Sequence, residues 1–304
     1  MAKNNLLCSL DIGTSNTRAI VGEVDRDGNL NIIGIGQCKS TGLKKGIVID
    51  IEATVRGIND AVSQAERMIG EEIASVYVAI GGPQTNLIGN RGVVAVQGDE
   101  KEVSSADVER VIQAARVLAI PPEREIINVC PVSYIVDGYE GIKDPVGMIG
   151  VRLESEALII TGKATYLQNI RRCVERTGLE VAGLIFKGLS SGTMALTHDE
   201  RELGCALIDI GGGVAEISVY KHDSILDFVS IPQGGDLITQ DLAHGLRVPY
   251  THAEQIKHTY GAATMETAGG DVLKVESVGS TQPYEVEAIE LVDYIQPRVE
   301  EMFD

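Results

Sequence analysis

The sequence contains no tryptophan and only three phenylalanines, and it lacks an apolar run long enough to cross a membrane. Its five cysteines are scattered and show no C-x-x-C spacing, which argues against a zinc site and against a disulfide framework. The N-terminus has one early lysine and a short apolar run and does not match a secretory signal peptide. These absences favour a cytoplasmic globular protein whose thiols stay reduced.

Basic residues are also scarce. The 26 lysines and arginines compare with 44 aspartates and glutamates, which gives a formal net charge of −18. Such a surface repels nucleic acid and anionic lipid, so we expect neither as a direct partner of this chain. The 304 residues, 44% of them hydrophobic, are enough for two domains with sizeable cores.

Two segments share one design: LDIGTSNT at Leu10–Thr17 and LIDIGGGVAEISVY at Leu207–Tyr220. In each, an apolar strand ends at an aspartate, Asp11 or Asp209, and an Ile-Gly turn leads into a second strand. Successive N–H groups in a glycine-rich turn can hold phosphate oxygens, and the carboxylate suits Mg²⁺ bound through water. One such turn is most often only a hairpin turn. A third strand follows each hairpin (LNIIGIGQC and SILDFVSIP), and this duplication favours a pair of phosphate loops.

The rest of the chain alternates between strand and helix patterns. Apolar spacing predicts helices over Ile51–Ile69, with Asp50 as the N-cap, over Ser104–Ile120 and over Tyr166–Thr177. The run Ser75–Gly82 is typical of a strand that returns to the first sheet. Further helices are expected over Leu189–Leu196, from Asp236 onward, and over Glu285–Phe303 with an interruption at Pro297.

The duplicated strand unit resembles that of the actin-like ATPase superfamily and, within it, the FtsA family of bacterial cell-division proteins. The similarity also rests on four longer segments, namely Gly42–Gly70, Gly141–Leu153 (GIKDPVGMIGVRL), Ile231–Leu246 and Ala253–Gly261. The resemblance implies an α/β, actin-like (ribonuclease H-like) two-domain ATPase fold with an inserted FtsA-type subdomain. It implies a first domain of residues 1–84 with 157–194, an insert of residues 85–156, and a second domain of residues 195–304 with an incomplete helical lobe from about 236.

The resemblance also implies ATP and Mg²⁺ as ligands, with Asp11 and Asp209 holding the metal through water. The nucleotide contacts that it implies are Asp11, Gly13, Thr14, Ser15, Asn16, Thr17, Asp209, Gly211, Gly212, Gly213, Gly234, Gly235, Glu254 and Lys257. From the residues alone, Gly234 and Gly235 fit a simple strand-to-helix turn equally well. Glu254 and Lys257, three residues apart, fit a solvated ion pair.

Hydrolysis is expected to be slow at most, and no catalytic residue is assigned. Efficient members of the superfamily place a Gln, Glu or Asp in a segment between the domains, where it orients the attacking water. The corresponding stretch here is interpreted as NVCPVSYIVDG, in which Val132 and Ser133 follow Pro131. Since positioning supplies most of the catalysis in phosphoryl transfer, the nucleotide is expected to serve as a conformational ligand more than as fuel.

The function implied by the resemblance is that of an ATP-binding, actin-like scaffold of bacterial cell division. It would polymerise and link filaments of the tubulin-like FtsZ to the inner face of the cytoplasmic membrane at the division site. The match places Arg298 and Glu301 on the surface that receives the FtsZ C-terminal tail, although an exposed i, i+3 ion pair explains them equally well. Later division proteins would bind the inserted subdomain.

Two alternatives stay open: an actin-like pilus-assembly or shape-determining protein, and a small-molecule kinase of the same superfamily. Chains of the FtsA family are longer, and this sequence stops at VEEMFD without a helix cap. We therefore expect a glycine-rich adenine loop, a helix returning to the first domain and a C-terminal amphipathic membrane helix to be missing from it.

Overall fold

The structure is a computed structural model that describes residues 6–98, 100–117, 120–276, 278 and 283–304. The chain divides into two compact units, which we describe separately. Unit 1 contains residues 1–209 and 216–231, and unit 2 contains residues 210–215 and 232–304.

Unit 1 contains a five-stranded sheet in the order β11-β6-β1-β2-β3. Strands β1 (Leu6–Ile12), β2 (Asn16–Val24) and β3 (Leu30–Lys39) form two successive antiparallel pairs, which confirms the first predicted strand unit. Strand β6 (Ser75–Ile80) runs parallel to β1, as predicted, and β11 (Glu180–Phe186) runs parallel to β6. The sheet therefore places the end of β1, where the first turn begins, beside the end of β6.

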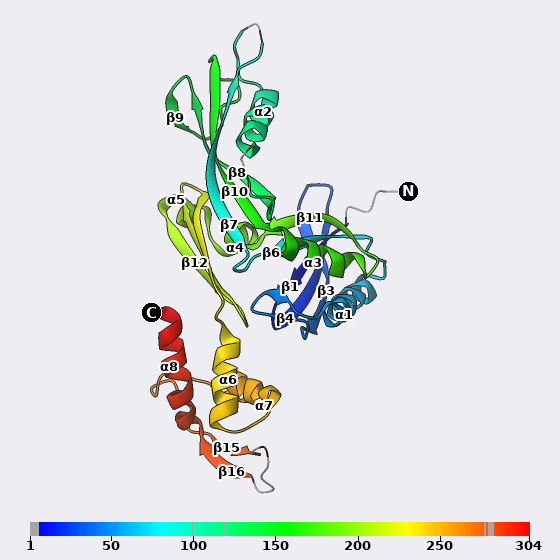
Figure 1. Cartoon of the computed structure of the whole chain (residues 1–304), viewed down its shortest axis with the longest axis vertical. Coiled ribbons are helices and arrows are strands. Elements are labelled where there is room, and N and C mark those ends of the chain that lie inside the picture. The colour runs from blue at the N-terminus through cyan, green and yellow to red at the C-terminus, as the bar shows by residue number, and fades with distance from the viewer. Residues whose placement is uncertain (1–5, 99, 118–119, 277, 279–282) are drawn as a thin grey trace. The chain divides into compact units, whose positions relative to one another are not determined.

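Helices α1 (Ile51–Ile69) and α3 (Ala164–Glu175) pack with the alternate inward residues of the sheet in one core (Figure 1). The predicted bounds of α1 are confirmed, and the Asp50 side chain caps it by accepting a hydrogen bond from the backbone N–H of Ala53 at 3.0 Å. Helix α3 ends before Gly178, whose φ of 88° is the left-handed value that glycine adopts without strain. A short hairpin of β4 (Leu43–Lys44) and β5 (Ile47–Val48) precedes α1.

A second sheet in unit 1 has the order β7-β10-β8-β9, with β7 (Thr85–Ala95), β8 (Arg124–Val136), β9 (Tyr139–Ile142) and β10 (Arg152–Lys163). Helix α2 (Ser105–Arg116) packs on it, with Ser104 as the N-cap.

Helix α2 ends earlier than the predicted boundary at Ile120. The backbone N–H of Val117 donates to the carbonyl of Ala114, three residues back, which closes the helix in a tighter turn. Residues 118 and 119, which the prediction included, lie outside the described residues.

The second predicted strand unit is confirmed as a three-stranded sheet of β12 (Cys205–Ile210), β13 (Ala215–Lys221) and β14 (Ser224–Ile231), in that order. Helices α4 (Lys187–Ala195) and α5 (His198–Leu203) precede it.

Unit 2 is mainly helical. It contains α6 (Gly235–Gly245), α7 (Tyr250–Tyr260), a small hairpin of β15 (Val272–Val275) and β16 (Tyr284–Glu287), the 3₁₀ turn η1 (Ala288–Leu291) and α8 (Val292–Phe303). Apolar residues from all of these elements share one core.

The prediction of a single helical run over Glu285–Phe303 is wrong at its start. Val286 and Ile289 fit a helical period, but Val286 lies in β16 and pairs with Leu273, so the regular helix begins only at Val292. Pro297 lies inside α8 and does not interrupt it, since the missing N–H removes only one backbone hydrogen bond.

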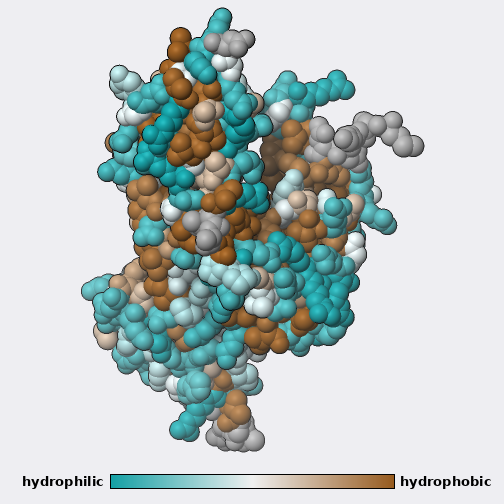
Figure 2. All heavy atoms as spheres, turned by 45° about the horizontal axis from the view of Figure 1, so that its top comes forward, coloured by the Kyte–Doolittle hydropathy of each residue, from teal (hydrophilic) through white to brown (hydrophobic). Residues whose placement is uncertain are grey.

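The surface carries many apolar side chains among the hydrophilic ones (Figure 2). On the face of the first sheet opposite α1 and α3, Leu7, Ile32 and Ile35 are 43%, 55% and 52% exposed. All five cysteines are free thiols, which confirms the expectation of no disulfides. Among the described residues, no helix combines the length and apolarity that crossing a bilayer needs.

Candidate functional site

The carboxylate of Asp11, at the end of β1, forms an ion pair with Lys187, the first residue of α4. The Nζ atom of Lys187 lies 2.6 Å from Oδ1 of Asp11, and the lysine side chain is 24% exposed. Burial would lower the pKa of Lys187, but the charge and hydrogen bond of Asp11, together with the charges of Glu216 and Tyr166, outweigh burial and raise the pKa above its ordinary value. Arg18 is more distant, at 4.0 Å from the other carboxylate oxygen. Asp11 is therefore held by a cation that follows a different strand of the same sheet.

Glu216 on β13 is a second acidic group close to this ion pair. Its Oε1 accepts a hydrogen bond from the backbone N–H of Gly82, and burial raises the pKa of Glu216 despite the nearby charge of Lys187. The hydroxyl of Tyr166 donates to the carbonyl of Gly81 at 3.2 Å, and burial raises the pKa of this phenol to about 12. Buried polar groups thus surround the ammonium of Lys187.

A small pocket opens at this cluster. Its lining residues come from α4 and from β12 and β13, and they are Lys187, Gly188, Ser191, Leu207, Asp209, Glu216 and Ser218. Asp209, the carboxylate that ends the second predicted loop strand, is exposed at this pocket. The partner of Asp11 and the second predicted carboxylate therefore lie in one place within unit 1.

The first predicted loop is a tight turn between β1 and β2. The N–H of Gly13 donates to the carbonyl of Asn16 at 3.0 Å. A Cβ atom at Gly13 would lie 2.8 Å from that carbonyl oxygen, so the turn requires glycine there. The side-chain oxygen of Asn16 accepts a hydrogen bond from Gln37 at 3.1 Å.

The hydroxyl groups of this loop hold the turn to its neighbours. The Oγ1 atom of Thr14 accepts a hydrogen bond from the N–H of Gly46 at 2.9 Å. The carbonyl of Ser15 accepts one from the N–H of Ser40, and the hydroxyls of Thr17 and Ser40 lie 2.9 Å apart. Thr14 and Thr17 therefore stabilise the loop, and its backbone is the part suited to an anion.

In unit 2, the second predicted loop lies against the start of α6. The carbonyls of Gly211 and Gly212 accept hydrogen bonds from the N–H groups of Gly235 and Asp236, at 3.0 and 2.7 Å. A Cβ atom at Gly234 would lie 2.4 and 2.5 Å from these two carbonyl oxygens, which explains the glycine. The structure thus brings together loop residues 211 and 212 with Gly234 and Gly235, and Gly213 belongs to the same loop.

Glu254 and Lys257 on α7 complete this cluster. Lys257 donates to the carbonyl of Gly235 at 3.1 Å and to Thr239 at 2.8 Å, and it pairs with Glu254 at 2.7 Å. Burial would raise the pKa of Glu254, but hydrogen bonds from Lys257 and Thr239 lower it. His258 adds a contact to Glu254 at 3.0 Å. The pair is therefore tied to the glycine turn and is not a solvated pair on a helix surface.

Two predicted features lie elsewhere. Ser133, proposed at the water-orienting position, lies in β8 and donates to Glu156 on the neighbouring strand at 3.0 Å. Arg298 on α8 contacts both oxygens of Asp241 on α6, at 2.6 and 3.1 Å, and also pairs with Glu301. The hydrogen bonds to Asp241 raise the pKa of Arg298.

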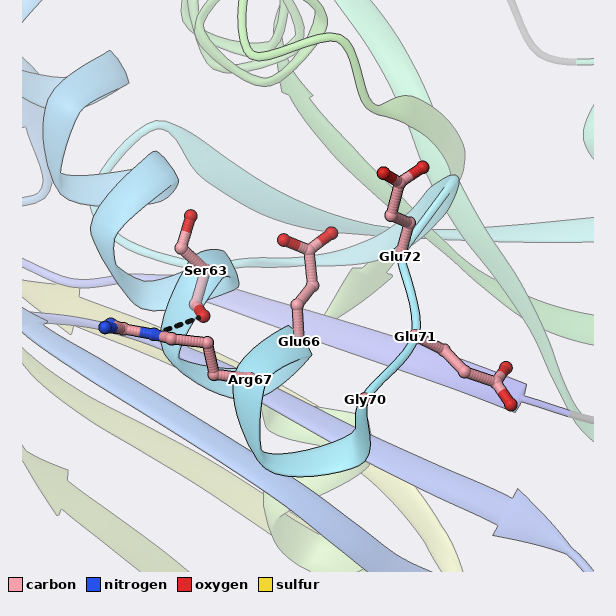
Figure 3. Close-up of a pocket in the computed structure, with 6 residues that line it drawn as sticks. All are labelled: Ser63, Glu66, Arg67, Gly70, Glu71 and Glu72. Atoms are coloured by element: carbon pink, nitrogen blue, oxygen red, sulfur yellow. Dashed lines mark hydrogen bonds between the residues drawn. The ribbon is translucent and has the colours of Figure 1, made fainter.

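The pocket at the end of α1 is unrelated to these residues. It is lined by Ser63, Glu66, Arg67, Gly70, Glu71 and Glu72 (Figure 3). Glu66 accepts a hydrogen bond from the N–H of Ile73 at 2.8 Å, and Arg67 donates to the carbonyl of Ser63 at 3.0 Å. Within the described part of the chain, no group of three or more His, Cys, Asp or Glu side chains is arranged to hold a metal ion.

Comparison with known proteins identifies the family. A family model described as "SHS2 domain inserted in FTSA" matches residues 82–161, and one described as "Cell division protein FtsA" matches residues 206–294. The cell division protein FtsA of Pseudomonas aeruginosa is 42% identical over 98% of this chain and 71% of its own length. That of Bacillus subtilis is 44% identical over 100% of this chain and 69% of its own length. The chain belongs to the FtsA family.

Solved structures support the fold class expected for an FtsA relative. The PilM–PilN type IV pilus biogenesis complex matches with a TM-score of 0.63 at 16% identity, over 97% of this chain and 74% of that chain. MreB5 of Spiroplasma citri bound to ADP matches with a TM-score of 0.55 at 15% identity, over 99% and 77%. Together with the inserted SHS2 domain, these matches confirm the actin-like fold. The pilus and shape-determining alternatives share that fold, but the identity over the whole chain is to FtsA.

Sequence reasoning missed Lys187, Glu216, Gly82 and Tyr166. The only local signal was at Lys187, where a charged residue follows the apolar strand β11 directly and starts a helix of small residues.

Proposed function

We propose that the chain is an ATP-binding, actin-like scaffold of bacterial cell division that polymerises and links FtsZ filaments to the membrane. The observation that carries this proposal is the 40–44% identity to FtsA proteins over nearly the whole chain. The scaffold would act on the inner face of the cytoplasmic membrane at the division site, with later division proteins bound to the inserted subdomain.

The residues proposed to contact ATP include those of the two glycine turns, namely residues 13–17 with Asp11 and Asp209, and residues 211–213 with Gly234 and Gly235. The packing of Gly234 against the carbonyls of Gly211 and Gly212 fixes the second turn against the start of α6. Glu254 and Lys257, fixed beside the same turn, are suited to the ribose and adenine.

Magnesium fits this arrangement less well at Asp11 than at Asp209. The carboxylate of Asp11 already has the Lys187 ammonium at 2.6 Å, so a cation bound there through water would have to compete with it. Mg²⁺ would therefore bind together with ATP, and Asp209 would contact it through water.

Hydrolysis would be slow at most. Phosphoryl transfer depends on positioning the attacking water, and the group beside Asp11 is an ammonium and not a carboxylate or an amide. Glu216, the acidic group near this pair, accepts a hydrogen bond from Gly82, and burial raises its pKa.

The FtsZ C-terminal tail, which is acidic and partly apolar, would bind the surface around Arg298 and Glu301 on α8. The Nε and Nη2 atoms of Arg298 donate to Asp241, which fixes the guanidinium, and the Nη1 atom pairs with Glu301. A carboxylate of the tail would replace Glu301 as the partner of Arg298. The Glu301 side chain is 56% exposed, so its ion pair with Arg298 contributes little free energy.

Titration calorimetry with an FtsZ C-terminal peptide tests the proposal. Glu301→Gln removes the internal competitor and should strengthen binding by roughly threefold, whereas Arg298→Glu should weaken binding by about tenfold or more. Arg176→Glu is the matched control, because Arg176 forms an ion pair with Glu52 within unit 1. Equal affinity in all four proteins would contradict the assignment of this surface.

A further inference from the structure

Lys187 occupies the place beside Asp11 where a metal-assisted phosphate site would need its cation. We propose that the Lys187 ammonium is a phosphate-positioning group that partly substitutes for the divalent cation, so that nucleotide binding depends only weakly on Mg²⁺. This inference rests on the proposed binding of ATP.

Lys187 lies beside both Asp11 and the small pocket. Lys187 is the first residue of α4, directly after β11, and its Nζ atom lies 2.6 Å from the carboxylate of Asp11. The same side chain lines the small pocket that contains Asp209. An ammonium has three N–H donors, so it can keep Asp11 as a partner and still donate to a second oxygen acceptor.

The charges of Asp11 and Asp209 both act on Glu216, and the Lys187 ammonium lies 2.6 Å from the carboxylate of Asp11. Two or three carboxylates would repel an incoming polyphosphate if no cation offset them. The ammonium therefore supplies the compensation that a magnesium ion supplies in other phosphate sites.

Lys187 does not stabilise the helix that it begins. A positive charge in the first turn of a helix is unfavourable with the helix dipole, and α4 has no acidic residue there and no side-chain N-cap. The position of Lys187 is thus explained by its contact with Asp11 and the pocket, and not by the stability of α4.

The experiment measures the affinity of residues 1–304 for ATP by titration calorimetry, in Mg²⁺ and in EDTA. In the wild type, we expect removal of Mg²⁺ to weaken binding by less than about tenfold. In Lys187→Gln, the same removal should weaken binding by about a hundredfold or more, and Lys187→Arg should lie between the two.

Lys143→Gln is the matched control, because Lys143 also forms a 2.7 Å ion pair, with Glu202, away from the pocket. It should show the Mg²⁺ dependence of the wild type. The inference is overturned if the ratio of affinities in Mg²⁺ and EDTA is the same in the wild type and in Lys187→Gln. It is also overturned, whether or not the variant folds, if the wild type itself loses ATP binding by about a hundredfold in EDTA. No binding of ATP under either condition would overturn the proposed function as well.

Discussion

Gly234 lies so close to Gly212 that a single methyl group at Gly234 would come within 2.5 Å of the Gly212 carbonyl oxygen. The atom that it would strike belongs to the backbone of the second glycine turn, so the clash cannot be relieved by turning a side chain. The turn and the start of α6 therefore have to keep their present spacing.

The neighbouring glycine provides the comparison that tests this relationship. A Cβ atom at Gly235 would meet only the Lys257 ammonium at 3.5 Å and the Gly211 carbonyl at 3.9 Å, both ordinary contacts. We predict that Gly234→Ala lowers the free energy of unfolding of unit 2 by about 1–3 kcal/mol, whereas Gly235→Ala changes it by less than about 0.5 kcal/mol. Urea unfolding followed by circular dichroism checks both values, and equal effects of the two substitutions would contradict the close approach.

The inserted subdomain should lose stability in acid through Asp107. Burial would raise the pKa of this carboxylate, but hydrogen bonds from the side chain and N–H of Ser104, from the N–H of Gln97 and from Arg110 lower it to about 2. Because the pKa in the folded state lies below the ordinary 3.8, the stabilisation is complete above that value and is lost as the pH falls toward 2.

Acid titration followed by circular dichroism measures this loss. We expect the wild type to lose about 2 kcal/mol of stability between about pH 4 and pH 2 that Asp107→Asn does not lose, because the variant lacks the titrating group. Identical acid profiles for the two proteins would show that Asp107 does not control the transition.

Arg298 should contribute to unit 2 mainly through Asp241. That contact joins α8 to α6 with two hydrogen bonds, while Glu301 is a neighbour on the same helix and is 56% exposed. We predict that Asp241→Asn costs about 1–2 kcal/mol of unfolding free energy and that Glu301→Gln costs less than about 0.5 kcal/mol. The reverse order in urea unfolding would show that the pair within α8 is the stabilising one.

Much of the fold could be predicted from the sequence where one local signal dominated. The two strand units and α1, with its Asp50 cap, follow from apolar runs, turn residues and a regular helical period. The start of the last helix could not be predicted, because Val286 and Ile289 fit a helical period and only the pairing of Val286 with Leu273 shows that Val286 lies in a strand.

In the candidate site, too, the features with a local sequence signal could be predicted and those that depend on long-range pairing could not. Residues within each glycine turn could be predicted from local spacing, and the structure brings Gly211, Gly212, Gly234 and Gly235 together. The contact of Lys187 with Asp11 depends on β6 lying between β1 and β11, an order of strands that no local pattern encodes. Val132 and Ser133, in the stretch interpreted as corresponding to the water-orienting segment, lie in β8, and Ser133 hydrogen-bonds to Glu156 within the second sheet.

The most direct test of the account is the affinity of the chain for ATP when each glycine turn is changed, measured by titration calorimetry in Mg²⁺. Gly212→Asp should weaken binding by about tenfold or more, a loss of at least about 1.4 kcal/mol, because it adds a negative charge beside the phosphates. Asp209→Ala should weaken binding by a smaller factor, because it removes the carboxylate proposed to hold Mg²⁺ through water. Gly89→Asp, at an exposed position of β7 with open space around it, should bind ATP as the wild type does. Equal affinity in the wild type, Asp209→Ala and Gly212→Asp would contradict the claim that these turns hold the nucleotide.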